Sequence, residues 1–296
     1  MADLLLDHVR RFADAHVDAD GVAATPVEGL VMLRETGPTT LQYAVSRPLV
    51  ALVLQGRKRV AMGSRAFEFG AGDSLLITTD VPTLSQITSA SRILPYYSLV
   101  LELDAAIIRD LVDQIGPAPF EADQPVRVDP TDSEIADAAL RLVRLFDRPQ
   151  ALETLGASLR RELHYWLLNG RHGGAIRALG VVDSHAHRIG RAVALLRARF
   201  TEPIRIHELA QVAGMSLSAF HVHFRSITSL TPLQFQKQLR LIEARRRLVA
   251  GGEAISSAAF GVGYESIPQF TREYGRLFGQ PPARDVRQTA QMGAMA

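Results

Sequence analysis

One short pattern occurs twice in the last third of the chain, and this repeat constrains the fold more than any other feature. The first copy begins at Leu209–Ser216 and the second at Ala258–Ser266. Equivalent residues lie 49 or 50 positions apart: Ala210 and Ala259, Gly214 and Gly263, Phe220 and Phe270, Phe224 and Tyr274, Pro232 and Pro282. Each copy therefore predicts a short apolar helix, a turn at glycine, and a second helix that starts at serine.

This order of elements is the plan of a helix-turn-helix, whose second helix lies in the major groove when the motif binds DNA. Helix–glycine–helix corners also occur in helical domains with other roles, so one copy alone would be weak evidence. Two copies in register, joined by a predicted long helix from Pro232 to Val249, are much stronger evidence. We expect the two units at about residues 206–226 and 255–278.

Charge is divided unevenly along the chain. From Ser184 onward there are 15 Lys and Arg against 7 Asp and Glu, a net charge of +8. The preceding residues carry 18 against 24, a net charge of −6, and the two parts sum to the +2 of the whole chain. A basic segment is typical of a domain that binds a polyanion. A chain of 296 residues is long enough for two domains, and we expect them over residues 1–180 and 181–290.

Short β-rich segments follow one another from about Val27 to Asp104. They are Gly29–Arg34, Leu49–Leu54, Arg59–Met62, Ala66–Phe69, Ser74–Thr78 and Tyr97–Leu103. Six or more short strands at this spacing favour a small barrel or jelly roll, and the Gly70–Asp73 turn resembles that of cupin-type barrels. Helical periodicity follows over about residues 104–170. The predicted fold class is therefore α+β, with a cupin-like β-barrel and accessory helices first and an all-α domain second.

The content of this barrel is the main open question. A catalytic cupin needs histidine and carboxylate ligands for a metal, but the chain has no histidine between His16 and His164 and no cysteine anywhere. We therefore expect no metal, no cofactor and no catalytic residue. The interior is then either filled by side chains or open to a small ligand. The polar residues that could line such a pocket are Gln42, Gln55, Arg57, Lys58, Arg59 and Gln86. An ordinary solvent-facing position remains the alternative for each of them.

The N-terminal sequence has acidic residues where a signal peptide needs positive charge. The apolar run Leu49–Leu54 is too short to cross a bilayer. We therefore expect a cytoplasmic protein without membrane contacts. The tail from Gln288 to Ala296 lacks periodicity, and we expect it to be disordered.

Six motifs of the last hundred residues belong together: Leu209–Ser216, Pro232–Arg240, Ala244–Arg246, Gly263–Ser266, Gln269–Tyr274 and Phe278–Pro282. They resemble the signature of the AraC/XylS family of bacterial transcription regulators. The stretch Arg47–Lys58 and the turn Ala71–Asp73 also resemble the N-terminal domain of one branch of that family. The resemblance implies a seven-helix DNA-binding domain, a cupin-like effector or dimerisation domain, a homodimer, and activation through contact with RNA polymerase. Pro282–Arg287 departs from the pattern, because most members place an aromatic residue before the arginine.

The resemblance also implies which residues contact DNA. The expected base contacts are Ser218, His221 and Val222 on the first recognition helix, and Gln269, Thr271 and Arg272 on the second. The expected backbone contacts are Ser216, Arg225, Lys237, Ser266 and Arg276. Arg272 can form a bidentate pair with guanine, and Gln269 with adenine. The aromatic residues Phe220, Phe224, Phe270, Tyr274 and Phe278 are instead expected in the core.

The sequence thus indicates a sequence-specific transcriptional regulator that binds double-stranded DNA, with a small-molecule effector acting through the N-terminal domain. The alternative is an effector-independent regulator whose N-terminal domain only dimerises or binds a protein partner. An enzyme fused to a DNA-binding domain is a third possibility. The family contains such a fusion in alkylation repair, but that chemistry needs cysteine, so we expect no enzymatic activity.

Overall fold

The computed structural model describes residues 2–63, 65–116, 126–181, 183–251 and 253–293. The chain forms two compact units, Met1–His187 and Arg188–Ala296, which we describe separately. The boundary predicted at 180/181 lies a few residues before this division, and the role of each part stays a prediction. Within the described part of the chain, every helix is too short or too polar to cross a membrane.

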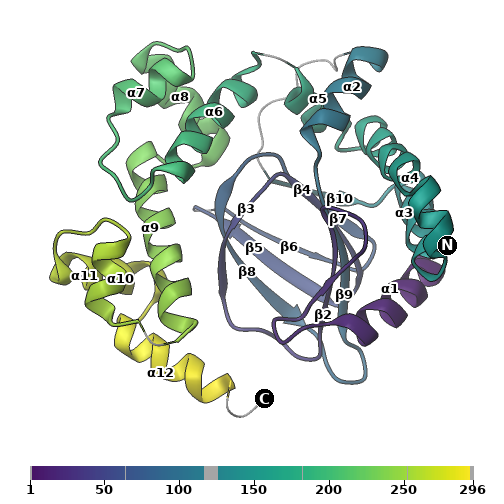
Figure 1. The fold of residues 1–296 in the computed structure, drawn as a ribbon, viewed down its shortest axis with the longest axis horizontal. Helices are drawn as coiled ribbons and strands as arrows, with labels where there is room; N and C mark the ends of the chain where they lie inside the picture. Colours follow the sequence, from purple (N-terminus) through teal and green to yellow (C-terminus); the bar gives the residue numbers. More distant parts are fainter. Residues whose placement is uncertain (1, 64, 117–125, 182, 252, 294–296) are drawn as a thin grey trace. The chain divides into compact units, whose positions relative to one another are not determined.

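The first unit contains ten strands among its described residues (Figure 1). They are β1 (Val22–Ala24), β2 (Leu30–Glu35), β3 (Gln42–Ser46), β4 (Leu49–Gln55), β5 (Arg57–Met62), β6 (Arg65–Gly70), β7 (Asp73–Ile77), β8 (Val81–Ser89), β9 (Tyr96–Glu102) and β10 (Val126–Pro130). A six-stranded sheet has the order β1-β2-β9-β4-β7-β10, and a four-stranded sheet has the order β3-β8-β5-β6. All neighbouring strands are antiparallel.

The six predicted strands correspond to β2, β4, β5, β6, β7 and β9, and the prediction missed β1, β3, β8 and β10. Three of the missed strands are the edges of their sheets. Strand β1 has only three residues, too few to show alternation, whereas β3 and β10 contain polar or charged residues that weaken the hydrophobic alternation. The fourth, β8, is central but contains Pro82, which pairs with Val45 of the edge strand β3. Proline in a run argues against a strand when only the sequence is known.

Helices cover the outer face of the six-stranded sheet. They are α1 (Ala2–His16), α2 (Ala105–Ile115), α3 (Ser133–Val143), the short 3₁₀ helix η1 (Arg144–Asp147), α4 (Pro149–Asn169) and α5 (Gly173–Gly180). Leu5 and Val9 of α1 share one buried core with Met32 of β2, Leu99 of β9 and Leu142 of α3. Figure 1 shows α1, α3 and α4 along this side of the strands. The other face of the sheet is therefore left for the space between the two sheets.

The second unit contains seven helices in its described part, as the family resemblance implies. They are α6 (His185–Ala198, which begins in the first unit), α7 (Ile206–Val212), α8 (Leu217–Thr228), α9 (Pro232–Val249), α10 (Ile255–Gly261), α11 (Ile267–Phe278) and α12 (Pro282–Gly293). The expected disorder of the tail is wrong for residues 288–293, because α12 extends through them. The cause lies in its first turn, where buried Asp285 bonds to Arg245 of α9. Residues 294–296 lie outside the described part.

The long helix α9 contributes to the packing of both repeats. Its Phe235 ring packs edge-on against Phe224 of α8, with 5.6 Å between ring centroids. Its Leu241 and Leu248 belong to a second core, together with Phe270 of α11. One helix that packs on two sides needs apolar residues over a wide stripe. This explains the wide stripe in its sequence.

Candidate nucleic-acid interface

The first helix-turn-helix consists of α7 and α8. Gly214 in the turn has φ = +60°, a conformation that favours glycine. Ser216 then caps α8, because its Oγ accepts a hydrogen bond from the Ala219 backbone N at 3.3 Å. Phe220 and Phe224 are fully buried on the inner face of α8. Their burial confirms the prediction that they are core residues, and it fixes which face of the helix is exposed.

The second helix-turn-helix, α10 and α11, is built around a closer backbone contact. Gly263 has φ = +89°, and a Cβ at this position would lie 2.1 Å from the Thr201 carbonyl oxygen. The Arg240 guanidinium of α9 holds the two segments together. It donates to the carbonyl oxygens of Gly263 at 2.8 Å, Phe200 at 2.6 Å and Thr201 at 3.1 Å. The second glycine is therefore required both by its φ and by space.

The exposed face of α8 carries the base contacts predicted for the first helix-turn-helix. Ser218, His221 and Val222 are all exposed, and they follow the spacing of three and four residues that places side chains on one helix face. Arg225, predicted to contact the backbone, is exposed three residues further along. Val222 is 64% exposed, which is unusual for a valine. The structure therefore brings these four side chains together on one surface.

On α11 the predicted residues divide into two groups. Arg272 and Arg276 are exposed and one turn apart, whereas Gln269 and Thr271 are half-buried. The buried side holds Phe270 and Tyr274, which confirms them as core residues, and Phe278 packs against the same core. Across the described residues, the ion pairs of this unit involve none of the arginines of α8 and α11. Their guanidinium groups are thus available to an external anion.

Gln269 and Lys237 share a partner inside the protein. Glu273 is 14% exposed and accepts from Lys237 Nζ at 2.8 Å and from Gln269 Nε2 at 3.2 Å, both on Oε1. Its Oε2 accepts from the Tyr264 hydroxyl at 2.8 Å. Burial raises the pKa of Glu273, but these three hydrogen bonds together lower it by more than burial raises it, so the pKa lies below its usual value. A predicted base contact and a predicted phosphate contact are therefore both held by one ionised carboxylate.

The two capping serines have a second possible role. Ser266 Oγ accepts from the Gln269 backbone N at 3.4 Å, as Ser216 does at the start of α8. Accepting a bond leaves each hydroxyl proton free for donation. The start of a helix also attracts anions, because its backbone N–H groups are unpaired. Both serines therefore remain candidates for phosphate contacts while they cap their helices.

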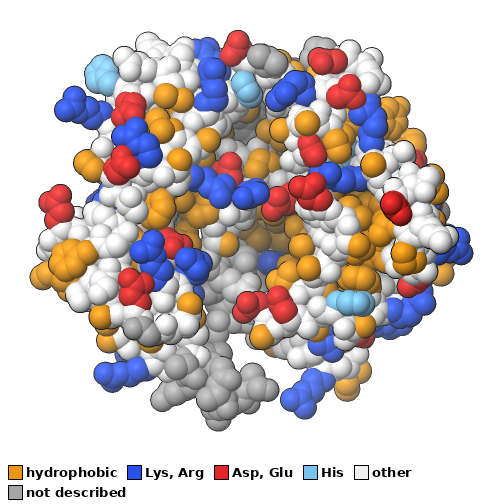
Figure 2. Space-filling model, in the orientation of Figure 1, with side chains coloured by type: hydrophobic (Ala, Val, Ile, Leu, Met, Phe, Trp, Pro, Cys, Tyr) orange, Lys and Arg blue, Asp and Glu red, His pale blue; other side chains and the backbone are white. Residues whose placement is uncertain are grey.

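The other basic residues of α9 bond to carboxylates within the unit, and of these Arg246 is also solvent-exposed, at 69%. Arg245 forms a two-bond pair with Asp285, at 2.7 and 3.2 Å. Arg246 and Arg247 both bond to Glu243. On the face drawn in Figure 2, basic and acidic side chains are likewise interspersed. The net positive charge of this unit is therefore partly used to hold the fold together.

A polar cluster lies between the two sheets of the first unit. Lys58 of β5 shares a strand face with buried Val60 and Met62. Desolvation lowers its pKa to about 8, and Glu35 of β2 acts in the opposite direction. Because β2 and β5 belong to different sheets, this coupling places both side chains in the space between the sheets. Glu35 in turn has a raised pKa, mainly through its own burial.

Two hydroxyl groups of β9 face the same space. Tyr96 is the direct cross-strand partner of Glu35, and Ser98 follows on the same strand face. Both hydroxyls are buried and interact with each other, because the Ser98 hydroxyl acts on the pKa of Tyr96 as a hydrogen-bond partner; within the described part of the chain neither meets the geometry of a hydrogen bond to any other group. Burial is the main cause of the raised pKa of Tyr96. Buried polar groups normally have partners, so this cluster is a candidate ligand site.

Of the six polar residues named from the sequence, Lys58 is the one placed in this cluster. Gln42, Arg57 and Arg59 are exposed. Gln55 Nε2 donates to the Pro95 carbonyl oxygen at 2.6 Å, and Gln86 Nε2 donates to that of Thr39 at 2.9 Å. No sequence pattern pointed to Glu35, Tyr96 or Ser98. Strand pairing brings them together, and a single sequence does not reveal that pairing.

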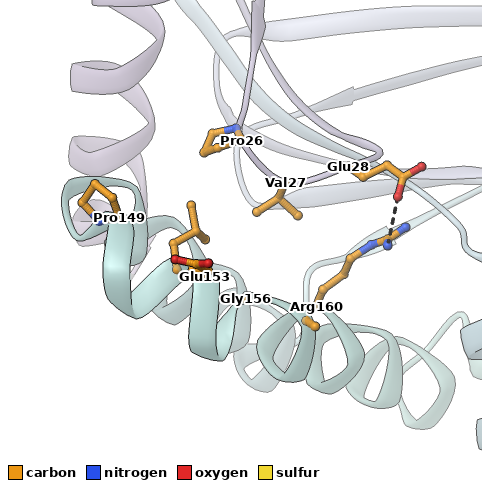
Figure 3. Close-up of a pocket in the computed structure, with 9 residues that line it drawn as sticks. Pro26, Val27, Glu28, Pro149, Glu153, Gly156 and Arg160 are labelled. Carbon is orange, nitrogen blue, oxygen red and sulfur yellow. Dashed lines mark ion pairs between the residues drawn. The ribbon is translucent and has the colours of Figure 1, made fainter.

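Two pockets of the first unit lie outside the sheets. The larger, of about 360 Å³, lies between the β1–β2 turn and α4, and Figure 3 shows Val27, Gly156 and Arg160 around it. Arg160 pairs with Glu28 at 4.0 Å at its edge. The smaller, of about 270 Å³, is lined by α1, β4 and the start of α3. Neither is the barrel cavity that a ligand sensor would need.

Histidines of the first unit have structural roles. His172 is buried, its Nε2 lies 2.9 Å from Ser74 Oγ, and desolvation lowers its pKa. His164 Nε2 accepts from the Asp104 backbone N at 3.1 Å. Among residues that the structure describes, no three His, Cys, Asp or Glu side chains are grouped as a metal site would require.

Two family models match the sequence. The model described as "AraC-type transcriptional regulator N-terminus" matches residues 26–175, and a "Helix-turn-helix domain" model matches residues 209–288. Among known relatives, the transcriptional regulator GbdR of Pseudomonas aeruginosa is 34% identical over 113 residues, 38% of this chain and 30% of GbdR. The transcriptional activator RhaS of Escherichia fergusonii is 30% identical over 101 residues, 34% of this chain and 36% of RhaS. The matches therefore span about a third of each relative.

The fold resembles that of ToxT from Vibrio cholerae. A crystal structure of wild-type ToxT with a bound unsaturated fatty acid has a TM-score of 0.57 to this chain, at 10% sequence identity. The match covers 87% of this chain and 93% of ToxT. At this identity the likeness concerns the fold, which in both proteins includes the strand-rich and the helical unit.

Proposed function

Because the chain belongs to the AraC-type transcriptional regulators, whose N-terminal model matches residues 26–175, we propose that it regulates transcription by reading a specific DNA sequence. The proposed base contacts are Ser218, His221 and Val222 of α8 and Gln269, Thr271 and Arg272 of α11. The proposed backbone contacts are Ser216, Arg225, Lys237, Ser266 and Arg276. The binding is non-covalent, and no catalytic step is part of the proposal.

The observation that carries this proposal is the pair of exposed helix faces built on the same plan. In each helix-turn-helix, aromatic residues hold one face of the second helix in the core and leave the opposite face exposed. Side chains that can read base edges lie on that open face, together with arginines that lack an ion-pair partner among the described residues. Base-reading groups on a rigid helix and cations beside them are what major-groove recognition requires.

The test is selection of genomic DNA fragments by the full chain, repeated over a range of salt concentrations. We expect one enriched motif, and Arg272→Ala should relax a single base position by a factor of about 5 to 150, as for loss of a bidentate pair. Arg276→Ala is the matched control, since loss of a phosphate contact weakens all sequences alike. Salt-sensitive binding without any enriched motif would contradict the proposal.

For the first unit, we propose an effector site between the two sheets, at Lys58, Glu35, Tyr96 and Ser98. Two buried hydroxyls that have only each other as partners among the described residues, and a lysine with a lowered pKa, support this site. The fatty acid in the ToxT structure supports the idea that this fold can hold a small molecule. Binding there would shift the equilibrium between states of different DNA affinity.

The alternative is a first unit that only dimerises or binds a protein partner. The pockets outside the sheets are the observation that favours it, because a partner could cover them. Ligand screening by thermal shift separates the two readings. A stabilising compound whose effect disappears in Lys58→Met supports the effector site, whereas stabilisation that depends only on protein concentration supports dimerisation.

We further propose that the protein acts in the cytoplasm as a homodimer and activates transcription through contact with RNA polymerase. The activator name of the relative RhaS supports the direction of regulation. The family membership supports the contact with the polymerase.

A further inference from the structure

Glu273 lies beside Arg272 in the sequence, but its side chain is directed toward α9 rather than outward. It contacts three groups that come from different parts of the second unit: Lys237 on α9, Tyr264 before α11, and Gln269 one turn earlier on α11. The Glu273 carboxylate therefore has more partners than an ordinary surface ion pair. It connects a candidate base-reading side chain to the framework of the domain.

The bond from Gln269 to Glu273 fixes how the Gln269 amide is oriented. An ionised carboxylate has only acceptors, so it must receive an N–H of the amide and cannot bond its carbonyl oxygen. The two ends of a glutamine amide are otherwise assigned from their partners. With Nε2 at 3.2 Å from Glu273 Oε1, the Oε1 atom of Gln269 is left for the exterior, together with the second N–H.

This orientation selects among bases. In the major groove adenine offers an acceptor at N7 and a donor at N6, whereas guanine offers two acceptors, N7 and O6. A glutamine that presents its oxygen and one N–H matches adenine. Against guanine, the same oxygen would face another acceptor and lose a hydrogen bond. If the amide could turn freely, its NH₂ group could face the base and donate to the acceptors of guanine, and Gln269 would then bind either purine.

We propose that Glu273 is a positioning residue that fixes the Gln269 amide and thereby makes the second recognition helix prefer adenine to guanine at one base pair. The inference rests on the proposed function, since it requires Gln269 to reach a base. Lys237 is then a support of Glu273, and its contribution to phosphate binding is secondary. Tyr264 holds the other carboxylate oxygen, which limits rotation of the Glu273 side chain.

The test uses the full chain and two duplexes of its enriched motif that differ by adenine or guanine at the position that Gln269→Ala relaxes. We expect the wild-type protein to prefer adenine by about 5- to 150-fold. Glu273→Met has a similar length but no acceptor, and it should reduce this ratio to less than a third of the wild-type value. Glu273→Gln should keep most of the ratio, because its amide oxygen can still accept from Gln269.

Glu265→Met is the matched control. Glu265 lines a pocket of about 240 Å³ together with Gln269 and Glu273 and has the same charge as Glu273, and no hydrogen bond links it to Gln269 in the described structure. It should leave the ratio unchanged. An unchanged ratio in Glu273→Met, or an equal loss in Glu265→Met, would overturn the inference. In the Gln269→Ala background, Glu273→Met should have no further effect on the ratio, which excludes a general loss of structure. Absence of any enriched motif would instead count against the proposed function.

Discussion

Lys58, a residue of the proposed effector site, should reduce the stability of the unliganded protein. It is half-buried, Glu35 is the charged group that faces it, and desolvation lowers its pKa from 10.5 to about 8. The folded protein therefore holds this proton less tightly than the unfolded chain does. Below pH 8 the cost of the buried charge is fully present, and it is relieved as pH rises from 8 to 10.5.

Lys58→Met should therefore stabilise the unliganded protein at pH 7, by about 1–3 kcal/mol. The gain should shrink between pH 8 and pH 10.5 and be absent above that range. Urea-induced unfolding at several pH values measures it. Arg59→Met, a change at the exposed neighbour, should alter stability by less than about 0.5 kcal/mol at any pH. A Lys58→Met protein no more stable than the wild type at pH 7 would contradict this account.

Sequence periodicity predicted the residues that pack and missed the polar residues that join distant segments. Phe220 and Phe270 were identified because apolar residues recur at helical spacing. Arg240, Glu273 and Asp285 were not identified as structural, because their partners lie in other elements, up to 40 residues away. Lys58 was named only as one of six polar candidates. Its alternation with Val60 and Met62 on β5 was the signal that could have selected it.

At the scale of elements, α12 depends on one buried carboxylate. Asp285 accepts from Arg245, from the Tyr274 hydroxyl at 2.7 Å and from Gln280 Nε2 at 2.9 Å. Its side chain is 6% exposed, and although burial raises its pKa, these bonds lower it below the usual value. This network lies next to Val286, where the expected aromatic residue is missing. Val286 itself packs against the second core, beside this network.

Asp285→Asn should destabilise α11 and α12 by about 2–4 kcal/mol, because it removes the buried carboxylate charge that pairs with Arg245. Hydrogen exchange in peptides of these two helices measures the change locally. Glu243→Gln is the control. Glu243 also has a lowered pKa, of about 2, but it is 24% exposed, and its change should cost less than about 1 kcal/mol.

The pH dependence follows from the sign of the shift. Because the folded state lowers the pKa of Asp285, its contribution is present above the usual carboxyl pKa and is lost as pH falls through the folded value. The difference between Asp285→Asn and the wild type should therefore decrease in acid. Equal exchange rates in both proteins at pH 7 would show that α12 is held by other contacts.

For the whole molecule, the sequence predicted the order of the strand-rich and helical units better than the strand pairing and the polar cluster inside the first of them. The repeat predicted both helix-turn-helix units, since each depends on local signals: a glycine turn, a serine cap and aromatic residues four apart. The strand-rich unit depends on pairing between distant segments, such as β2 with β9. Its fold class was therefore predictable, whereas its edge strands and the cluster between its sheets were not.

The proposed function requires both helix-turn-helix units to read DNA together. Because α9 packs in the cores of both, we expect them to bind as one body, with their recognition helices in successive major grooves.

Hydroxyl-radical footprinting of the full chain on its enriched motif would show whether both recognition helices bind. We expect two protected segments about one helical turn, or ~10 base pairs, apart. His221→Ala should weaken protection of one segment and Arg272→Ala that of the other. A single protected segment, or two segments that both variants weaken equally, would contradict the account.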